Sequence, residues 1–480
     1  MSSHIDRIPL ELLEKVFKFY ASDGLTEPSL GSTIRPSSLT STLSFSASPF
    51  ILGAVCSLWR ETSLAMPCLW SSLAVYRPRY AQIGTIRLWL ERSKEVPLSL
   101  YLYEPFIPDP ANEEARESIL FLFLRHAHRW KHFYAKLSGD HPAESLCTLP
   151  INDLIMLESV ELDFREHVGD YGSPWLSFYK ISSLRRVTWD SSSAIRGAHN
   201  FAPWSTLTHV KLPLVPNLTI DSLLKNILYA VNLVDLEVAM SMPLEPLPPP
   251  PARLKCVSEA ALESLRAQLP PGWWERTISD AVALGRAMQR EENLRTALFA
   301  PIDLPNLQSL KIHAHGRDAA PLLDRLKLPE LKSLHILHYT TYPVAPSTRY
   351  IIALLERSGL YKLDTLSIYD PDMREDEVVK LLTSRRLQAL RKLELLVSSV
   401  GDNTVQLLFV RRGMQYRLPY LTHLVLPDCV TSEGMLLKMV VSRQPLLNTV
   451  KFCVTADTPM SDVAKLRKLA SRTGFCLSTV

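Results

Sequence analysis

The most regular feature of the sequence is a short pattern, L-x-x-L-x-L, whose three apolar positions hold leucine, valine, isoleucine or an aromatic residue. Its ten copies are Leu157/Val160/Leu162, Leu184/Val187/Trp189, Leu207/Val210/Leu212, Leu233/Leu236/Val238, Leu307/Leu310/Ile312, Leu331/Leu334/Ile336, Leu363/Leu366/Ile368, Leu390/Leu393/Leu395, Leu421/Leu424/Leu426 and Leu447/Val450/Phe452. A degenerate copy at Trp130/Phe133/Ala135 precedes them. Apart from one long interval, the copies follow one another about every 27 residues, a period typical of repeat proteins.

The last two apolar positions of each copy alternate with polar ones, which predicts a strand with one buried face. Helical patterns lie between copies, at Asp221–Tyr229, Thr348–Arg357, Glu375–Ser384 and Glu433–Arg443. Because one strand and one helix cannot bury their apolar faces alone, we expect the copies to stack. The expected fold class is α/β: a leucine-rich-repeat solenoid over residues 129–480, with a concave parallel β-sheet and convex helices. The alternative is an ordinary doubly wound α/β domain, which the regular spacing disfavours.

The long interval predicts an insertion at about residues 241–300. It opens with the proline-rich run at residues 243–251, which cannot form a helix or a central strand. Two helical patterns follow, at Ser258–Gln268 and Trp273–Leu298. The run is interpreted as a stiff connector, and a docking peptide for an aromatic-lined domain is the less favoured interpretation.

The first 75 residues follow a different pattern. From Pro9 to Tyr20 the apolar residues occupy one half of a helical wheel, which is wider than the stripe that a single core usually needs. A second helix, predicted over Phe50–Ala65 after Ser48-Pro49, is apolar nearly all round. The two helices carry more apolar surface than they can hide in each other. They therefore either pack on the repeats or present a patch to another protein.

Three segments of this region carry a family resemblance. They are Ile8-Pro9-Leu10-Glu11-Leu12-Leu13-Glu14-Lys15-Val16-Phe17, Val55-Cys56-Ser57-Leu58-Trp59-Arg60-Glu61 and Pro67-Cys68-Leu69-Trp70-Ser71. In this order they resemble the opening, middle and closing motifs of an F-box, although Ile8 replaces the usual leucine and Ser57 the usual basic residue. The whole chain resembles fungal-type F-box proteins with C-terminal leucine-rich repeats. The domains expected are an F-box at 1–75 with a Ser/Thr-rich, disordered insert at 22–48, a connecting region and N-terminal cap at 76–128, and the repeat domain at 129–480.

The resemblance implies a substrate-recognition subunit of a cullin–RING (SCF-type) ubiquitin ligase. The F-box would bind a Skp-type adaptor and, through it, the cullin, while the repeats would bind a target protein. Carried over position by position, the adaptor-binding residues are Ile8, Pro9, Leu10, Leu13, Val16, Val55, Cys56, Trp59, Leu69 and Trp70. The alternative is a non-catalytic leucine-rich-repeat interaction scaffold that is not engaged in ubiquitin ligation.

One outward-facing residue in each predicted strand lies between the last two apolar positions of the copy. In order these residues are Tyr134, Glu161, Thr188, Lys211, Glu237, Lys311, His335, Ser367, Glu394, Val425 and Lys451. The mixed charge of these residues suits a protein-binding surface, although a surface that contacts only water would show the same pattern. A nucleic-acid-binding surface would carry a stripe of basic residues. The proposed substrate-binding residues are Glu161, Lys211, Glu237, Lys311, His335, Glu394 and Lys451. The insertion, with Trp273 and Trp274, is the rival site.

The chain holds 53 Lys and Arg against 49 Asp and Glu, and the net charge of +4 favours neither nucleic acid nor a membrane surface as a partner. Its seven cysteines are scattered without a C-x-x-C pair, which is typical of reduced, mostly buried thiols inside a cell. The N-terminus lacks the apolar core of a signal peptide, and no apolar run is long enough to cross a bilayer. We therefore expect a cytoplasmic or nuclear location.

The motifs of nucleotide-binding, metalloprotease and serine-hydrolase sites do not occur in the sequence. His126, His128 and His132 come nearest to a metal-binding cluster. However, Glu113–His128 is predicted to be helical, and side chains two residues apart on a helix diverge. We expect no catalytic residue, no cofactor and no bound metal.

Overall fold

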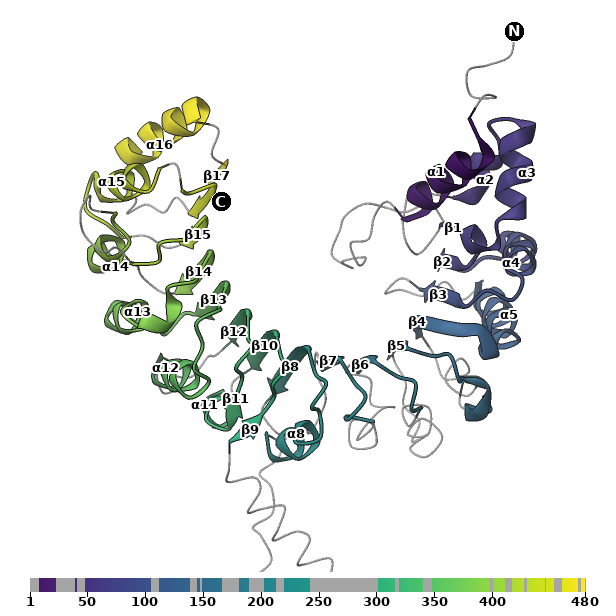
Figure 1. The fold of residues 1–480 in the computed structure, drawn as a ribbon, viewed down its shortest axis with the longest axis horizontal. Helices are drawn as coiled ribbons and strands as arrows, with labels where there is room; N and C mark the ends of the chain where they lie inside the picture. Colours follow the sequence, from purple (N-terminus) through teal and green to yellow (C-terminus); the bar gives the residue numbers. More distant parts are fainter. Residues whose placement is uncertain are drawn as a thin grey trace, which may run out of the picture. The chain divides into compact units, whose positions relative to one another are not determined.

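The computed structural model describes residues 8–22, 39–40, 48–104, 112–138, 145–146, 149–165, 181–189, 203–212, 220–241, 301–315, 319–339, 348–397, 400–410, 417–426, 430–444, 446–452, 460–473 and 476–479. The chain forms two compact units. The first unit comprises residues 1–217, 230–240 and 306–313, and the second comprises residues 218–229, 241–305 and 314–480. Each is a mixed α/β structure built on a parallel sheet, as the sequence predicts (Figure 1).

The first unit begins with helices and continues as alternating strands and helices. Its helices are α1 (Leu10–Ser22), α2 (Pro49–Gly53), α3 (Ser57–Ala65), α4 (Tyr80–Arg92) and α5 (Glu113–Leu124), with 3₁₀ turns η2 (Pro67–Trp70), η4 (Ala127–Arg129) and η5 (Ile151–Asp153). Its strands are β1 (Leu39–Thr40), β2 (Ser72–Tyr76), β3 (Leu98–Tyr103), β4 (Trp130–Ser138), β5 (Ser159–Arg165), β6 (Arg186–Trp189), β7 (His209–Leu212), β8 (Asp235–Ser241) and β10 (Ser309–His315). Strands β2 to β8 pair in chain order and in parallel, and β1 pairs antiparallel with β2.

The second unit repeats the same alternation. Its helices are α8 (Ile220–Ile227), α11 (Ala320–Leu323), α12 (Thr348–Arg357), α13 (Glu375–Leu382), α14 (Asp402–Leu407), α15 (Met435–Ser442) and α16 (Met460–Thr473), with the 3₁₀ turn η8 (Arg385–Leu387). Strands β12 (Ser333–Tyr339), β13 (Thr365–Asp370), β14 (Lys392–Val397), β15 (His423–Leu426), β16 (Thr449–Phe452) and β17 (Cys476–Thr479) form a parallel sheet in chain order. A separate two-stranded sheet joins β9 (Ile302–Asp303) to β11 (Leu326–Lys327). Helices α12 to α15 lie along one side of β12 to β16 (Figure 1).

The core of each unit consists of rows of apolar side chains from equivalent positions in neighbouring strands. In the second unit the row Leu334, Leu366, Leu393, Leu424 and Val450 is in register from β12 to β16, and all five side chains are buried. Every copy of the L-x-x-L-x-L pattern contributes its last two apolar residues to a strand in this way. The strands predicted from the ten copies are confirmed. They form because the alternation of apolar and polar residues gives each strand one apolar face to bury.

A regular set of hydrogen bonds ties each copy to the one before it at the edge where the strands begin. A single carbonyl accepts two backbone N–H groups from the next copy. Arg185 O accepts from Thr208 and His209, and Arg391 O accepts from Thr422 and His423. Side chains add to this set, since Thr208 Oγ1 and Thr422 Oγ1 donate to the same two carbonyls. The edge thus fixes the register of one strand on the next.

Two of the expected helices differ in the structure, and one strand forms where none was expected. The expected helix over Phe50–Ala65 is broken between α2 and α3, because Cys56 adopts an extended backbone and its Sγ accepts the N–H of Trp59 at 3.5 Å as an N-cap. The helix expected to reach His128 ends at Leu124, and η4 follows it. Leu39 and Thr40, expected within a disordered insert, form β1 along the edge of β2.

Strand β2 lies at the end of the region expected to be the F-box, and β3 lies in the expected connecting region; both continue the sheet. Leu73, Leu100 and Phe133 occupy the same register position, so the strand and helix alternation begins at β2 and not at β4. The proline-rich run, the two helices expected in the insertion and most of the Ser/Thr-rich insert lie outside the described residues.

Candidate functional site

Helices α1, α2 and α3 expose a group of large apolar side chains, here named the N-terminal apolar surface. Its members are Ile8, Leu10, Leu12, Val16, Phe19, Phe50, Ile51, Val55 and Leu64, each at least one-third exposed. On α1 the residues Leu12, Val16 and Phe19 stand four and three positions apart, so they form one stripe along the helix. Scattered exposed apolar residues are normal, but a group on adjacent short helices is a candidate protein-binding surface.

A second row of apolar side chains on α1, one residue after the exposed row, packs against the other helices and fixes the position of α1. Leu13 and Phe17 are 1% and 0% exposed, and the ring of Phe17 meets that of Trp59 edge to face. Below α2, Phe50, Trp70 and Trp89 form a triangle of edge-to-face rings with centroids 5.0–5.6 Å apart. The three helices therefore rest on the first strand and helix of the sheet through buried aromatic residues.

The residues expected to bind an adaptor divide into three groups by their exposure in the structure. Ile8, Pro9, Leu10, Val16 and Val55 are exposed on the N-terminal apolar surface, and Cys56 and Trp59 are half-buried. Leu13, Leu69 and Trp70 are buried, and the indole N–H of Trp70 donates to Ser63 O at 2.9 Å. These three side chains hold the helices together and do not face outward. Leu12, Phe19 and Ile51, which the motif comparison did not select, are among the more exposed apolar residues.

The outward residues expected from the strand pattern occupy one register position in each unit, here named the central row. In the first unit Glu161, Thr188, Lys211 and Glu237 pair in sequence from β5 to β8, and Lys311 lies on β10. In the second unit His335, Ser367, Glu394, Val425 and Lys451 pair from β12 to β16. Most of these side chains are half-buried, although Tyr134 and Ser367 are buried and Lys451 is exposed.

Three charged residues of the central row, Glu237, Lys311 and Glu394, form ion pairs. Glu237 Oε1 lies 2.8 Å from Lys311 Nζ and 3.0 Å from His313 Nε2. The hydrogen bond from His313 and the pairing with Lys311 outweigh the effect of burial and lower the pKa of Glu237 to about 2. Partial burial works to raise the pKa of Glu394, but hydrogen bonds from Lys392 and Ser367 outweigh it and lower that pKa. Both carboxylates are therefore ionised at neutral pH.

Strands β2, β3 and β4 carry four tyrosines near the start of the central row, of which only Tyr134 was expected. Tyr101 pairs with Tyr134 in that row, and Tyr76 and Tyr103 pair with each other two residues further along their strands. Tyr101 stacks on Tyr134 with ring centroids 5.3 Å apart, and Tyr76 lies beside Tyr103 at 5.8 Å. Burial, followed by the neighbouring Tyr101 and Tyr103, raises the pKa of Tyr76, so its hydroxyl stays protonated. The alternation of Leu98, Leu100 and Leu102 with polar and aromatic residues was the signal that could have located β3.

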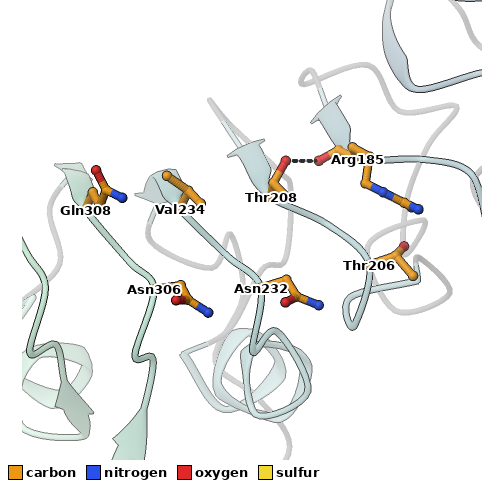
Figure 2. A pocket seen from close by; sticks show the side chains of 7 residues that line it. All are labelled: Arg185, Thr206, Thr208, Asn232, Val234, Asn306 and Gln308. Carbon is orange, nitrogen blue, oxygen red and sulfur yellow. Dashed lines mark hydrogen bonds between the residues drawn. The ribbon is translucent and has the colours of Figure 1, made fainter.

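A shallow polar hollow of about 360 Å³ lies at the edge of the first unit where strands β7, β8 and β10 begin. Its lining consists of Arg185, Thr206, Thr208, Asn232, Val234, Asn306 and Gln308, which Figure 2 shows side by side on neighbouring copies. The amide groups of Asn232 and Asn306 donate to Ser205 O and Val231 O, and Thr208 Oγ1 donates to Arg185 O. Most of the hollow's polar groups thus connect successive copies, and Arg185 is its one ionisable side chain.

The cysteines and histidines of the described residues do not form a reactive or metal-binding cluster. Cys68 is exposed, and not buried as expected, while Cys56 is half-buried. Burial lowers the pKa of His126 and of His132, and adjacent cations add to the effect. Among the described residues, no three His, Cys, Asp or Glu side chains are placed to hold a metal ion. None of the helices in the described part of the chain is long and apolar enough to span a membrane.

No family model matches this chain, and no curated protein matches its sequence.

Proposed function

We propose that the chain is the substrate-recognition subunit of a cullin–RING (SCF-type) ubiquitin ligase, built from an F-box and a leucine-rich-repeat solenoid. The observation that carries the proposal is the N-terminal apolar surface. The segments that resemble an F-box are the ones that expose Leu10 and Val16 on α1 and Val55 in the turn between α2 and α3. The rows of paired strands and covering helices that follow support the repeat part of the proposal.

In this proposal the N-terminal apolar surface binds the Skp-type adaptor, and the cullin joins through the adaptor. Full burial of one large apolar side chain contributes about 1.5–3 kcal/mol. Burial of Leu12, Val16 and Ile51, each about half exposed, therefore supplies a substantial part of the affinity of a specific complex. The buried Leu13, Leu69 and Trp70 contribute indirectly, because they fix the positions of the helices that carry the exposed residues.

The sheet would bind the target protein through the central row of each unit. Ion pairs such as Glu237 with Lys311 hold these side chains in fixed positions, which lowers the entropy lost on binding. The subunit then performs no chemistry of its own. It raises the effective concentration of the target protein near the ubiquitin-charged enzyme.

The test is co-purification of the full-length chain with a Skp-type adaptor. Val16→Glu and Ile51→Glu each place a charge on the N-terminal apolar surface, where both side chains are about half exposed. Each should abolish capture of the adaptor while the thermal unfolding temperature stays within a few degrees of wild type. Phe121→Glu is the matched control, because Phe121 is exposed on α5, outside that surface. Capture of the adaptor by both glutamate variants at the wild-type level would favour the interaction scaffold over the ligase subunit.

A further inference from the structure

The edge of the second unit where strands β13, β14 and β15 begin carries two exposed aromatic side chains. Tyr361 and Tyr420 are 69% and 63% exposed, which is high for tyrosine in a folded protein. The guanidinium of Arg386 stacks over the ring of Tyr361, with its central carbon 4.3 Å from the ring centroid. Arginine and tyrosine are both enriched at the energetic centres of protein interfaces.

Two of the arginines at this edge come from equivalent positions in successive copies. Arg386 directly precedes Leu387 and Arg417 directly precedes Leu418, and the same turn follows each, closed by Leu390 N–H to Leu387 O and by Leu421 N–H to Leu418 O. The strands that follow, β14 and β15, are paired neighbours, and neighbouring strands lie about 4.8 Å apart. Arg417 Nη1 also donates to Thr383 O at 2.7 Å, which holds this arginine beside the start of η8.

The charges at this edge are only partly balanced. Lys362 pairs with Glu330 at 2.9 Å, and Arg391 pairs with Asp364 at 3.4 Å. For Arg385, Arg386 and Arg417, by contrast, no carboxylate lies within ion-pair distance among the described residues. Three like charges on neighbouring turns repel one another, so this arrangement favours a negatively charged partner.

We propose that this arginine–tyrosine edge, formed by Tyr361, Arg385, Arg386, Arg417 and Tyr420, binds an extended acidic segment of a partner protein. The planar guanidinium matches a carboxylate with two parallel hydrogen bonds. The tyrosine rings add apolar contact at a low cost in conformational entropy. Since the cations are distributed along an edge over successive copies, they suit several carboxylates of an extended chain better than one phosphate. The proposal concerns residues of the second unit alone and does not depend on adaptor binding.

The experiment measures binding of a fluorescein-labelled peptide of about ten glutamates to the full-length protein by fluorescence anisotropy at low salt. Binding should weaken steeply as salt is added, and a lysine peptide of equal length should not bind. The double variant Arg385→Gln/Arg386→Gln should bind the glutamate peptide at least about tenfold more weakly, because charge-assisted hydrogen bonds are lost. Lys465→Gln/Lys468→Gln removes the same charge from the exposed side of α16 and should change the affinity less than about twofold.

A second variant leaves all the arginines and tyrosines of the edge in place. Ala389 is half-buried in the turn that follows Arg386, so Ala389→Glu places a negative charge at the centre of the edge. It too should lower the affinity at least about tenfold. Equal losses in the arginine and the lysine double variants would overturn the proposal. Tighter binding of an oligouridine or of a singly phosphorylated neutral peptide than of the glutamate peptide, lost in the arginine variant, would assign the edge to nucleic acid or to phosphate instead.

Discussion

The ring of Phe17 meets the ring of Trp59 edge to face, with centroids 5.0 Å apart and planes inclined by 66°. This contact joins α1 to α3 and lies under the N-terminal apolar surface. Phe17 is fully buried, whereas Phe19, two residues further along the same helix, is 67% exposed. One phenylalanine of this helix therefore holds the helices together, and the other lies exposed on the N-terminal apolar surface.

The two phenylalanines should respond differently to truncation. Phe17→Ala removes a buried ring and should lower the free energy of unfolding by about 3–5 kcal/mol, measured by urea denaturation. Phe19→Ala should change it by less than about 0.5 kcal/mol while weakening capture of the Skp-type adaptor. Equal stability of the two variants would contradict the packing described for Phe17. Undiminished capture by Phe19→Ala would place the adaptor contact elsewhere.

The same division shows how far the sequence could predict the candidate site. The apolar half of the α1 wheel is plain from spacing alone, and so is the surplus of apolar surface. Which stripe faces inward depends on where Trp59 and Trp70 lie, and spacing along one helix carries no such information. For this reason the motif comparison selected the buried Leu13 and omitted the exposed Leu12 and Phe19.

Most strands were predictable from the filled apolar positions of the pattern. β2 was not predicted although Trp70, Leu73 and Val75 fill these positions, because Trp70 was assigned to the closing motif of the F-box. β3 was not predicted, because Pro97 occupies the first apolar position of the pattern, which leucine fills in most copies. Leu100 and Leu102, at the other two positions, are buried as in the other strands. The break between α2 and α3 occurs where Cys56 Sγ accepts a hydrogen bond from the backbone N–H of Trp59. Cysteine is not among the usual N-cap residues, so composition gave no warning of it.

A buried ion pair at the end of β3 provides a second prediction. Glu104 and Arg116 lie 3.2 Å apart and are 5% and 3% exposed. Replacing Arg116 alone with Leu leaves the carboxylate of Glu104 buried without its cation and should lower the free energy of unfolding by about 3–5 kcal/mol. Replacing both residues with Leu should lower it much less, because no charge then remains in the interior. Urea denaturation of the two single variants and the double variant measures the coupling.

Additive losses in that cycle would contradict the ion pair. Glu113, which also contacts Arg116 at 3.0 Å, is half exposed and can turn to water when the arginine is removed. Glu113→Gln therefore serves as the control, and it should change the free energy of unfolding by less than about 1 kcal/mol.

Charge reversal of two cations on the helices of the second unit should change the free energy of unfolding by different amounts, although the sequence predicts both on the convex side of the repeats. Arg357 Nε donates to Leu326 O at 2.9 Å, and its Nη2 donates to Leu323 O, so this side chain ties α12 to the preceding copy. Lys438 on α15 is exposed. Arg357→Glu should lower the free energy of unfolding by about 2–4 kcal/mol, since two carbonyls lose their donors and meet a like charge. Lys438→Glu should shift it by no more than about 0.5 kcal/mol, and a comparable loss there would refute the distinction.

The pairing of Glu237 predicts a pH dependence of stability. Its pKa in the folded protein is about 2, below its ordinary value of 4.5, so the unfolded chain binds the proton more tightly. The stabilisation by Lys311 and His313 is therefore complete above about pH 4.5 and is lost as the pH falls towards 2, by at most about 1.4 kcal/mol per pH unit. For the same reason, exchanging the charge of Glu237 should lower the stability of the fold.

Glu237→Gln isolates this effect, because the amide keeps the shape of the side chain and does not titrate. At pH 6, urea denaturation should show the full difference in free energy of unfolding between the wild type and the variant. The difference should shrink steadily when the comparison is repeated at about pH 4 and pH 3, since the wild type loses the charge that the variant never had. Glu158→Gln is the matched control, because Glu158 lies next to the start of β5 in the same unit and meets Lys131 at 3.6 Å with about half of each side chain exposed. A difference for Glu237→Gln that stays constant from pH 6 to pH 3 would mean that Lys311 and His313 do not stabilise the ionised carboxylate of Glu237.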